Sequence, residues 1–487
     1  MVFTEKLPPV AVALLDNALD FASSRAHSAV FQVQNPANGE TIADVPDFGP
    51  DEVQEAIESA RAAQPGWASR TARDRAAVLQ KWNTLIRNSA DALAHILTLE
   101  QGKPLAEARA EIASGADYIE WFAEEGKRLY GDVLPSTKLG TRCLVLKQPV
   151  GVVAAITPWN YPSGMIMRKI SPALAAGCSI VVKPAEDTPL SSLMLALLAH
   201  QAGIPEDILH VMTASSPDRV GAILTSSPHV RKLSFTGSTE VGKLLMRRSA
   251  DTVKNLSLEL GGNAPFIVFD DADLDAVVSA AVLTKFRNTG QICTSTNRFY
   301  IQSGIMDSFI ESFCDAVKRL RVGEGFERGI DVGPLINEAS VEKLLLLVRD
   351  MTSQGAQVLV GGERIIGGGY FFQPTVILAA GVNSTKASDV EIFGPIAPVF
   401  EFTDESEVIH EANNTAFGLA AYLWTNDAMR IWRMTEQLEY GMIGVNSILN
   451  SNVSAPFGGV KESGIGREGS RYGLDEYLEI KYISIGG

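Results

Sequence analysis

The chain has 487 residues, which is enough for two or three domains with sizeable cores. Hydrophobic residues make up 46% and charged residues 20%, as in an ordinary soluble globular protein, and no apolar run approaches the roughly 18 residues of a membrane span. The net charge of −15 argues against nucleic-acid binding, because no basic excess is present to neutralise phosphates.

The N-terminal segment predicts an amphipathic helix rather than a targeting signal. Val10–Leu15 is apolar, but Glu5, Asp16 and Asp20 surround it. A secretory signal has a basic start, and a mitochondrial transit peptide is poor in acidic residues. Neither pattern fits this segment.

The cysteines and histidines predict free thiols and no metal site. The cysteines, which are Cys143, Cys178, Cys293 and Cys314, form no CxxC pair and have no zinc-like spacing, and no HExxH motif is present. This usage suits a reducing, cytoplasmic location.

Residues 51–125 have the composition and spacing of helices. From Gly151 onward, short apolar runs alternate with helical stretches of about 20 to 25 residues, which predicts parallel βαβ units. The predicted strands are Val152–Ile156, Ser179–Lys183, Ile208–Met212 and Lys232–Thr236. Because parallel sheets bind ligands beyond the carboxyl ends of their strands, the loops TPWN, KPAE and TGST are expected at one edge.

A second alternating region begins near Phe266, continues past Phe400, and predicts another α/β domain. Near the end of the chain, Tyr477–Ile485 predicts a terminal strand, and Leu144–Gln148 is a candidate pairing partner for it.

The stretch FTGSTEVGKLL has the glycine and lysine spacing of a phosphate-binding G-x-x-x-x-G-K loop, with Gly237, Gly242 and Lys243. Leu244 stands where such a loop needs a hydroxyl for its magnesium ion. A P-loop nucleotide hydrolase is therefore an alternative that the motif alone leaves open.

Cys293 and Glu259 are candidates for a nucleophile and a general base. Cys293 lies in NTGQICTSTNR, and a cysteine becomes a good nucleophile when local dipoles or cations lower its pKa. Glu259 ends an apolar run beside two glycines, where apolar surroundings would raise its pKa toward neutrality. A buried core cysteine and an exposed glutamate at a strand end are the competing interpretations.

Three loops carry further candidate residues. In AAITPWNYP, Asn160 lies between two prolines and could donate a hydrogen bond to an oxyanion, although a turn asparagine is the commoner case. In KPAEDTP, Glu186 could hold ribose hydroxyls and repel a 2′-phosphate, or could form a solvated pair with Lys183. In EIFGP, Glu391 precedes a Gly–Pro turn, which alone suggests a plain surface turn.

The motifs PWNYP, KPAE, FTGSTEVG, LELGGN, GQIC and EIFGP occur in this order, and the chain resembles the NAD(P)-dependent aldehyde dehydrogenase superfamily over nearly its whole length. The resemblance implies an α/β aldehyde dehydrogenase-like fold with a Rossmann-type cofactor domain (1–127 and 149–260) and an α/β catalytic domain (261–461). It also implies a small β oligomerisation arm (128–148 and 473–487) in a dimer or tetramer.

By this resemblance, the Cys293 thiolate attacks the aldehyde, and the Asn160 side chain and the Cys293 amide stabilise the oxyanion. Hydride then passes to the nicotinamide, and Glu259 activates the water that hydrolyses the resulting thioester. Lys169 and Glu468 match family positions linked to proton movement.

The resemblance also implies a nicotinamide dinucleotide cofactor. The implied cofactor-binding residues are Trp159, Lys183, Pro184, Ala185, Glu186, Gly237, Ser238, Leu260, Glu391 and Phe393. In this family the loop with Gly237 faces the dinucleotide without a Walker magnesium, so Leu244 is compatible with it. Glu186 favours NAD, because some relatives that use NADP have serine there, and dual use stays open.

Several segments, among them IEWFAEEGKRLYGD, FIVFDDADLD and YFFQPTV, are similar to those of succinate-semialdehyde dehydrogenases. That similarity assigns the binding of a substrate carboxylate to Arg168, Arg287 and Ser451. Glutarate semialdehyde stays open as a substrate, because one methylene is worth only about 1–3 kcal/mol of discrimination. Ser295 stands where some relatives have a second cysteine, which disfavours a redox switch.

Two other functional classes are weaker alternatives. A cysteine hydrolase would need a histidine base for Cys293, and no histidine lies in a recognised motif. An inactive binding protein on the same fold is disfavoured by the retention of Cys293, Glu259 and Asn160.

Overall fold

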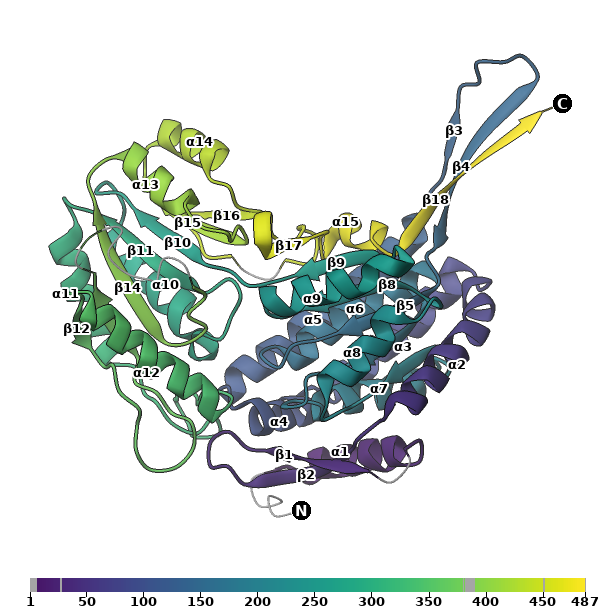
Figure 1. Cartoon of the computed structure of the whole chain (residues 1–487), viewed down its shortest axis with the longest axis horizontal. Coiled ribbons are helices and arrows are strands. Elements are labelled where there is room, and N and C mark those ends of the chain that lie inside the picture. The colour runs from purple at the N-terminus through teal and green to yellow at the C-terminus, as the bar shows by residue number, and fades with distance from the viewer. Residues whose placement is uncertain (1–6, 27–28, 380, 382–389, 450–451, 487) are drawn as a thin grey trace.

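The computed structural model describes residues 7–26, 29–379, 381, 390–449 and 452–486. Figure 1 shows two lobes side by side, each built around a sheet, and a narrow arm that projects from one of them and carries the C-terminus. Among the described residues, no helix combines the length and the apolar character needed to cross a membrane.

The first large sheet has the strand order β17-β9-β8-β5-β6-β7. Its strands are β5 (Val152–Ile156), β6 (Ser179–Lys183), β7 (Leu209–Val211), β8 (Val230–Thr236), β9 (Asn255–Glu259) and β17 (Gly464–Ile465). The pairs among β5 to β9 are parallel, and β17 pairs antiparallel with β9. The parallel βαβ prediction is confirmed. The uninterrupted apolar runs follow from burial on both faces of the sheet.

Helices cover this sheet as predicted. The crossover helices are α6 (Pro162–Ala176), α7 (Leu190–Ala202), α8 (Pro217–Ser226) and α9 (Thr239–Ser249). The N-terminal helices are α1 (Pro9–Ser23), α2 (Pro50–Ala68), α3 (Ala72–Asn88), α4 (Ala90–Gln101) and α5 (Leu105–Glu125). Every residue of α6 is buried. A buried α6 matters for function, because it begins beside the loop that carries Asn160.

A hairpin near the N-terminus has no counterpart in the sequence analysis. Strands β1 (Val30–Gln34) and β2 (Thr41–Pro46) pair antiparallel around a turn in which Gly39 has φ +76°. The Asn38–Gly39 dipeptide is a hairpin signal. The flanking strands are only five and six residues long, and the sequence analysis gave them no assignment.

The second large sheet has the order β12-β13-β14-β11-β10-β15-β16. Its strands are β10 (Ala264–Val268), β11 (Thr296–Gln302), β12 (Gln357–Val360), β13 (Thr375–Leu378), β14 (Ile396–Phe402), β15 (Ala420–Trp424) and β16 (Met442–Val445). The helices of this part of the chain are α10 (Leu274–Phe286), α11 (Met306–Lys318), α12 (Glu338–Ser353), α13 (Glu405–Asn413) and α14 (Ala428–Gln437). Helix α15 (Ser470–Asp475) packs against α5 and α6 of the first lobe. The predicted second α/β region is confirmed.

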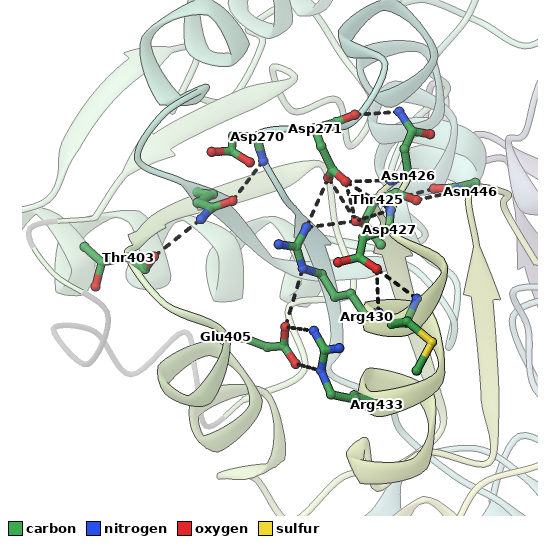
Figure 2. A network of polar contacts seen from close by, with 12 residues as sticks. Asp270, Asp271, Thr403, Glu405, Thr425, Asn426, Asp427, Arg430, Arg433 and Asn446 are labelled. Carbon is green, nitrogen blue, oxygen red and sulfur yellow. Dashed lines mark hydrogen bonds and ion pairs between the residues drawn. The ribbon is translucent and has the colours of Figure 1, made fainter.

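A polar network joins β10, β15 and α14 (Figure 2). The carboxylate of Asp271, just beyond β10, accepts hydrogen bonds from the Thr425 hydroxyl at 2.9 Å and from the amides of Asn426 and Asp427 at 3.0 and 3.1 Å. The Arg430 guanidinium lies 3.3 Å from the same carboxylate. These bonds satisfy amides at the start of α14 and fix the edge of the sheet formed by the carboxyl ends of its strands.

The arm consists of β3 (Asp132–Leu134), β4 (Thr141–Pro149) and β18 (Leu478–Gly486), in the order β18-β4-β3. Strand β18 pairs with β4, which confirms the predicted pairing, and the two strands are antiparallel. Val133, Ile480 and Tyr482 are exposed on it. The arm therefore presents apolar side chains that a single chain leaves in water.

Candidate active site

The candidate site lies where edges of the two large sheets approach each other. Glu259 is the last residue of β9, at the carboxyl edge of the first sheet. Cys293 comes three residues before β11, whose start pairs in parallel with that of β10 at the amino edge of the second sheet. The two loci are 34 residues apart along the chain, and tertiary packing joins them.

A cavity of about 250 Å³ brings together most of the residues assigned to catalysis and cofactor binding. Its lining includes Trp159, Asn160, Gly237, Ser238, Glu259, Leu260, Cys293, Glu391 and Phe393. These residues come from five of the six sequence motifs. The motifs that stand in one order along the chain therefore converge on one space.

The glycine loop ends β8 and begins α9 at this cavity. Ser238 is the N-cap of α9, and its hydroxyl accepts from the Val241 amide at 3.3 Å. A Cβ atom on Gly242 would lie 2.4 Å from Leu260, so glycine lets α9 pack closely against the strand that follows. Lys243 forms an ion pair with Glu462 at 2.6 Å on the surface, which gives no support to a Walker-type role.

Another part of the lining of this cavity is formed by Glu391, Phe393 and Trp159. The Glu391 carboxylate accepts from the Gly262 amide at 2.9 Å, and burial raises its pKa to about 7. Phe393 has φ +54°, a left-handed conformation that is uncommon for an aromatic residue, and its ring meets the Trp159 ring edge-on at 5.4 Å. The backbone holds the phenyl ring beside the cavity at some conformational cost.

The residues of the KPAE turn lie outside that lining, at the end of the neighbouring strand β6. The Lys183 ammonium lies 2.8 Å from the Glu186 carboxylate, with Pro184 and Ala185 in the turn between them. The Thr157 amide donates to the Lys183 carbonyl at 3.1 Å, which ties this turn to the loop after β5. The Lys183 side chain is buried, and 40% of the Glu186 side chain is exposed. The carboxylate at this sheet edge is therefore accessible to a ligand.

These features fit a dinucleotide. The N-terminus of α9 offers backbone amides to a diphosphate, and carboxylates at the sheet edge suit ribose hydroxyls. Two atoms in the cavity lining, Thr236 Oγ1 and Glu259 Oε1, are buried and have no hydrogen-bond partner within the described protein. Buried polar atoms of this kind usually have a partner, so their state points to a polar ligand or ordered water here.

The Cys293 thiol and the Glu259 carboxyl group line the same cavity and influence each other's pKa. Burial, followed by the nearby Glu468 charge, raises the pKa of Glu259 to about 8. Burial, followed by the Glu259 charge, also raises the pKa of the Cys293 thiol well above its usual value. The two groups therefore share a water-poor space that favours the neutral thiol of Cys293 and the neutral carboxyl group of Glu259. Glu259 can act as a base only after it has lost its proton.

Asn160 is held against the loop that carries Cys293. Its Nδ2 atom donates to the Gln291 carbonyl at 2.9 Å, and Gln291 lies two residues before Cys293. The side-chain nitrogen of Asn160 carries two hydrogens, so one remains for a ligand in the cavity that Asn160 and Cys293 both line. This arrangement can stabilise negative charge on an oxygen bonded to a carbon at Cys293 Sγ.

Lys169, on α6, and Glu468, shortly before α15, form a buried ion pair. The Lys169 ammonium lies 2.5 Å from Glu468 and 3.1 Å from the Ser234 hydroxyl, and Arg168 lies 3.7 Å from the same carboxylate. Burial would raise the pKa of Glu468, but the Lys169 and Arg168 charges outweigh it and hold this pKa below its usual value. In the described part of the chain, Lys169 and Glu468 lie outside the lining of both cavities at Cys293.

A second cavity, of about 670 Å³, opens on the other side of Cys293 and contains both predicted arginines. The Arg168 guanidinium stacks between Tyr118 at 4.7 Å and Phe457 at 4.6 Å. Arg287, which follows α10, lines the same cavity as Tyr161, and its interaction with Tyr161 contributes most to its raised pKa. Stacking restricts the Arg168 side chain, and both guanidinium groups lie in a largely apolar chamber. Ser451 lies outside the described residues.

The sequence analysis missed the residues that hold the site in shape. Tyr118, Phe457, Tyr161 and Gln291 each contact a predicted site residue. Gln291 lies in the quoted GQIC motif and Tyr161 in PWNYP, so motif membership was a signal for those two. Tyr118 and Phe457 contact an arginine 50 and 289 residues away, and no local pattern reports such a contact.

Comparison with known proteins agrees with this geometry. Residues 21–483 match the model described as the aldehyde dehydrogenase family. The chain is 53% identical to a succinate-semialdehyde dehydrogenase (NADP(+)) of Escherichia coli, over 93% of this chain and 94% of that protein. It is also 53% identical to a glutarate-semialdehyde dehydrogenase of Pseudomonas aeruginosa, over 94% of each.

A solved structure, that of succinate-semialdehyde dehydrogenase from Burkholderia pseudomallei, superposes with a TM-score of 0.92 at 54% identity. The match covers 94% of this chain and 95% of that one. The predicted aldehyde dehydrogenase-like α/β fold and the family resemblance are confirmed. The chain belongs to the aldehyde dehydrogenase family, and its reaction is the NAD(P)-dependent oxidation of an aldehyde.

Proposed function

We propose that this enzyme oxidises a short aldehyde with a terminal carboxylate, namely succinate semialdehyde or its homologue glutarate semialdehyde, to the corresponding diacid. The observation that carries the proposal is the position of Cys293 in the lining of both cavities. One cavity carries the arginines, and the other carries the loops that suit a dinucleotide. A carbonyl carbon at Cys293 Sγ would lie between a carboxylate clamp and the cofactor site.

In the proposed first step, Cys293 Sγ bonds to the carbonyl carbon while its proton passes to Glu259. The Asn160 amide and the Cys293 backbone N–H donate to the resulting oxyanion. When bound, the oxidised nicotinamide supplies the acceptor for the hydride that leaves this carbon. The product on Cys293 is a thioester.

Once the proton taken from Cys293 has passed to bulk solvent, Glu259 is again a carboxylate and acts as the general base for hydrolysis. Its carboxylate accepts a proton from the water that attacks the thioester, and the C–S bond breaks to release the acid and the Cys293 thiolate. The buried Lys169–Glu468 pair lies close enough to influence Glu259, because the Glu468 charge contributes to its raised pKa. We assign this pair to proton movement away from the site.

The clamp sets the proposed substrate class. Arg168 and Arg287 project guanidinium groups into a chamber whose lining is mostly apolar, where a carboxylate has much to gain from charge-assisted hydrogen bonds. The names of the two relatives, at equal identity, support both chain lengths. One methylene is worth only about 1–3 kcal/mol, so both substrates fit the proposal.

We propose NAD as the preferred cofactor, with NADP also accepted. The negative charge of Glu186 at the ribose-facing edge would repel a 2′-phosphate. The name of the Escherichia coli relative includes NADP(+), so the preference depends on this local charge and not on that likeness.

We also propose that the arm, residues 128–148 and 473–487, joins copies of the chain into a dimer or tetramer. Exposed apolar side chains on its strands support this role. We further propose a cofactor domain of residues 1–127 and 149–260 and a catalytic domain of residues 261–461. Strands β5 to β9 of the first large sheet lie in the former and β10 to β16 of the second lie in the latter, which supports this division. The free thiols of the described cysteines support a reducing, cytoplasmic location.

Replacing the base should trap the intermediate. In Glu259→Gln, the Cys293 thiol can lose its proton only to solvent, so acylation slows, but thioester hydrolysis slows more. An adduct with the mass of the acyl group should therefore accumulate on Cys293 during turnover of succinate semialdehyde. Intact-protein and peptide mass spectrometry measures this adduct. Cys293→Ala is the control, with no adduct and no NADH, and turnover by that variant would refute the nucleophile assignment.

The pH profile should report the same base. Because burial raises the pKa of Glu259 to about 8, the carboxylate fraction and hence steady-state kcat should rise as the pH increases through 8. The measurement is kcat from pH 6 to 10. The residual activity of Glu259→Gln should lack this rise, and an unchanged profile in that variant would contradict the assignment.

The clamp should discriminate by substrate charge. Arg287→Gln should lower kcat/KM for succinate semialdehyde by about 2 kcal/mol, or roughly 30-fold, and leave butanal nearly unaffected. Arg109→Gln, on the surface of α5, is the control and should change neither value. Equal losses on both aldehydes would remove the clamp from the proposal.

Removing the charge at the ribose edge should change cofactor preference. Glu186→Ser should shift the ratio of kcat/KM values for NAD and NADP toward NADP by about 1.5 kcal/mol, roughly tenfold. Glu206→Ser, an exposed acid elsewhere on the same lobe, should leave the ratio unchanged. A ratio that does not move in Glu186→Ser would assign cofactor choice to other residues.

A further inference from the structure

Lys103 is a buried cation close to the candidate site. It lies in the turn between α4 and α5, and only 1% of its surface is exposed. Its ammonium group donates to the Glu111 carboxylate at 2.6 Å and to the Asn160 backbone carbonyl at 2.8 Å, and it lies 4.0 Å above the Tyr161 ring. A cation without water is stable only with such partners.

The Glu111 carboxylate, on α5, supplies the N-terminal cap of α6. Its Oε1 atom accepts from the amides of Ser163 and Gly164, both at 2.9 Å. These are the second and third residues of α6, and the N-cap residue Tyr161 gives no side-chain cap. The negative charge also suits the positive end of the helix dipole. Lys103 thus neutralises a carboxylate that fixes the start of α6.

The Asn160 carbonyl is held from a second side as well. The Asn288 side-chain amide donates to it at 3.0 Å and to the Gln291 carbonyl at 3.2 Å. The same Gln291 carbonyl accepts from the Asn160 side chain at 2.9 Å. The backbone and the side chain of Asn160 are therefore both fixed relative to the loop that leads to Cys293.

We propose that Lys103 is a positioning residue for the oxyanion site, holding Asn160 so that its side-chain amide donates to the developing oxyanion at Cys293. This inference rests on the proposed function, in which Asn160 is an oxyanion donor. In the described part of the chain, Lys103 lies outside the lining of both cavities at Cys293. It therefore acts through Asn160 and not on the aldehyde itself.

The physical reason is that oxyanion stabilisation depends steeply on geometry. Without the ammonium group, Glu111 would be a buried charge without its cation, and the Asn160 carbonyl would lose one of its two donors. The start of α6 and the Asn160 loop would then relax together. A displacement of about 1 Å at such a donor costs on the order of 100-fold in rate.

The test is a double-mutant cycle between Lys103→Met and Asn160→Ala, measured as kcat and KM for the aldehyde and as Kd for NAD. Lys103→Met should lower kcat about 100-fold and change KM and Kd by less than about threefold. In the Asn160→Ala background, the same substitution should lower kcat less than about threefold, because its target is already gone.

The matched control is Lys232→Met. Lys232 is also fully buried, pairs with Glu476, and lies over the ring of Tyr477, but it makes no bond to Asn160. It should cost stability without a comparable loss of kcat. An equal loss of kcat in Lys232→Met and Lys103→Met would overturn the proposal.

Two outcomes separate this inference from the proposed function. If Asn160→Ala lowers kcat but the Lys103→Met effect is additive with it, the positioning role is wrong and the oxyanion role stands. If Asn160→Ala leaves kcat unchanged, the oxyanion role fails, and this inference fails with it. Should Lys103→Met not fold, Asn288→Gly removes another donor to the same carbonyl and tolerates the φ of +49° at that residue. Its effect should also be non-additive with Asn160→Ala.

Discussion

The parallel alignment of β5, β8 and β9 is the constraint on which the rest of the site depends. Parallel strands place their carboxyl ends along one edge, so the loops that carry Asn160 and Gly237 and the end-residue Glu259 lie in a row. The second sheet meets this row with the amino ends of β10 and β11. Gly262 lies two residues before β10, and Cys293 lies three residues before β11. Two short backbone alignments therefore place nucleophile, base and oxyanion donor together.

Helix α6 connects the functions of the site. It begins just after Asn160, and its residues Arg168 and Lys169 are adjacent in sequence but point about 100° apart on a helix. Arg168 lines the larger cavity, while Lys169 pairs with Glu468, and in the described part of the chain neither of these two lines a cavity at Cys293. Any shift of this helix along its axis would disturb substrate, oxyanion and proton handling at once, which explains why its N-terminus is capped by a buried carboxylate.

Burial and the neighbouring charges together set the pKa values of the carboxyl groups near the site. Within the described residues, Glu259 has no cationic hydrogen-bond partner, and its pKa is raised. Glu468 contacts two cations, and its pKa is lowered, although both carboxyl groups are buried. One carboxyl group can therefore accept a proton near neutral pH while the other stays ionised. The same low-polarity surroundings make each buried ion dependent on its partner.

The sequence by itself determined the parallel strands, the helices that cover them, the paired terminal strand and the family, because periodicity and short motifs are local properties of the chain. It also predicted which cysteine, glutamate and asparagine to examine. Only the tertiary structure decided that Arg168 stacks between Tyr118 and Phe457 and that Lys103 reaches Asn160. Those contacts join residues from 50 to 289 positions apart, and the pKa values depend on how completely water is excluded. Neither quantity is encoded in a local pattern, because each arises only when separate elements pack together.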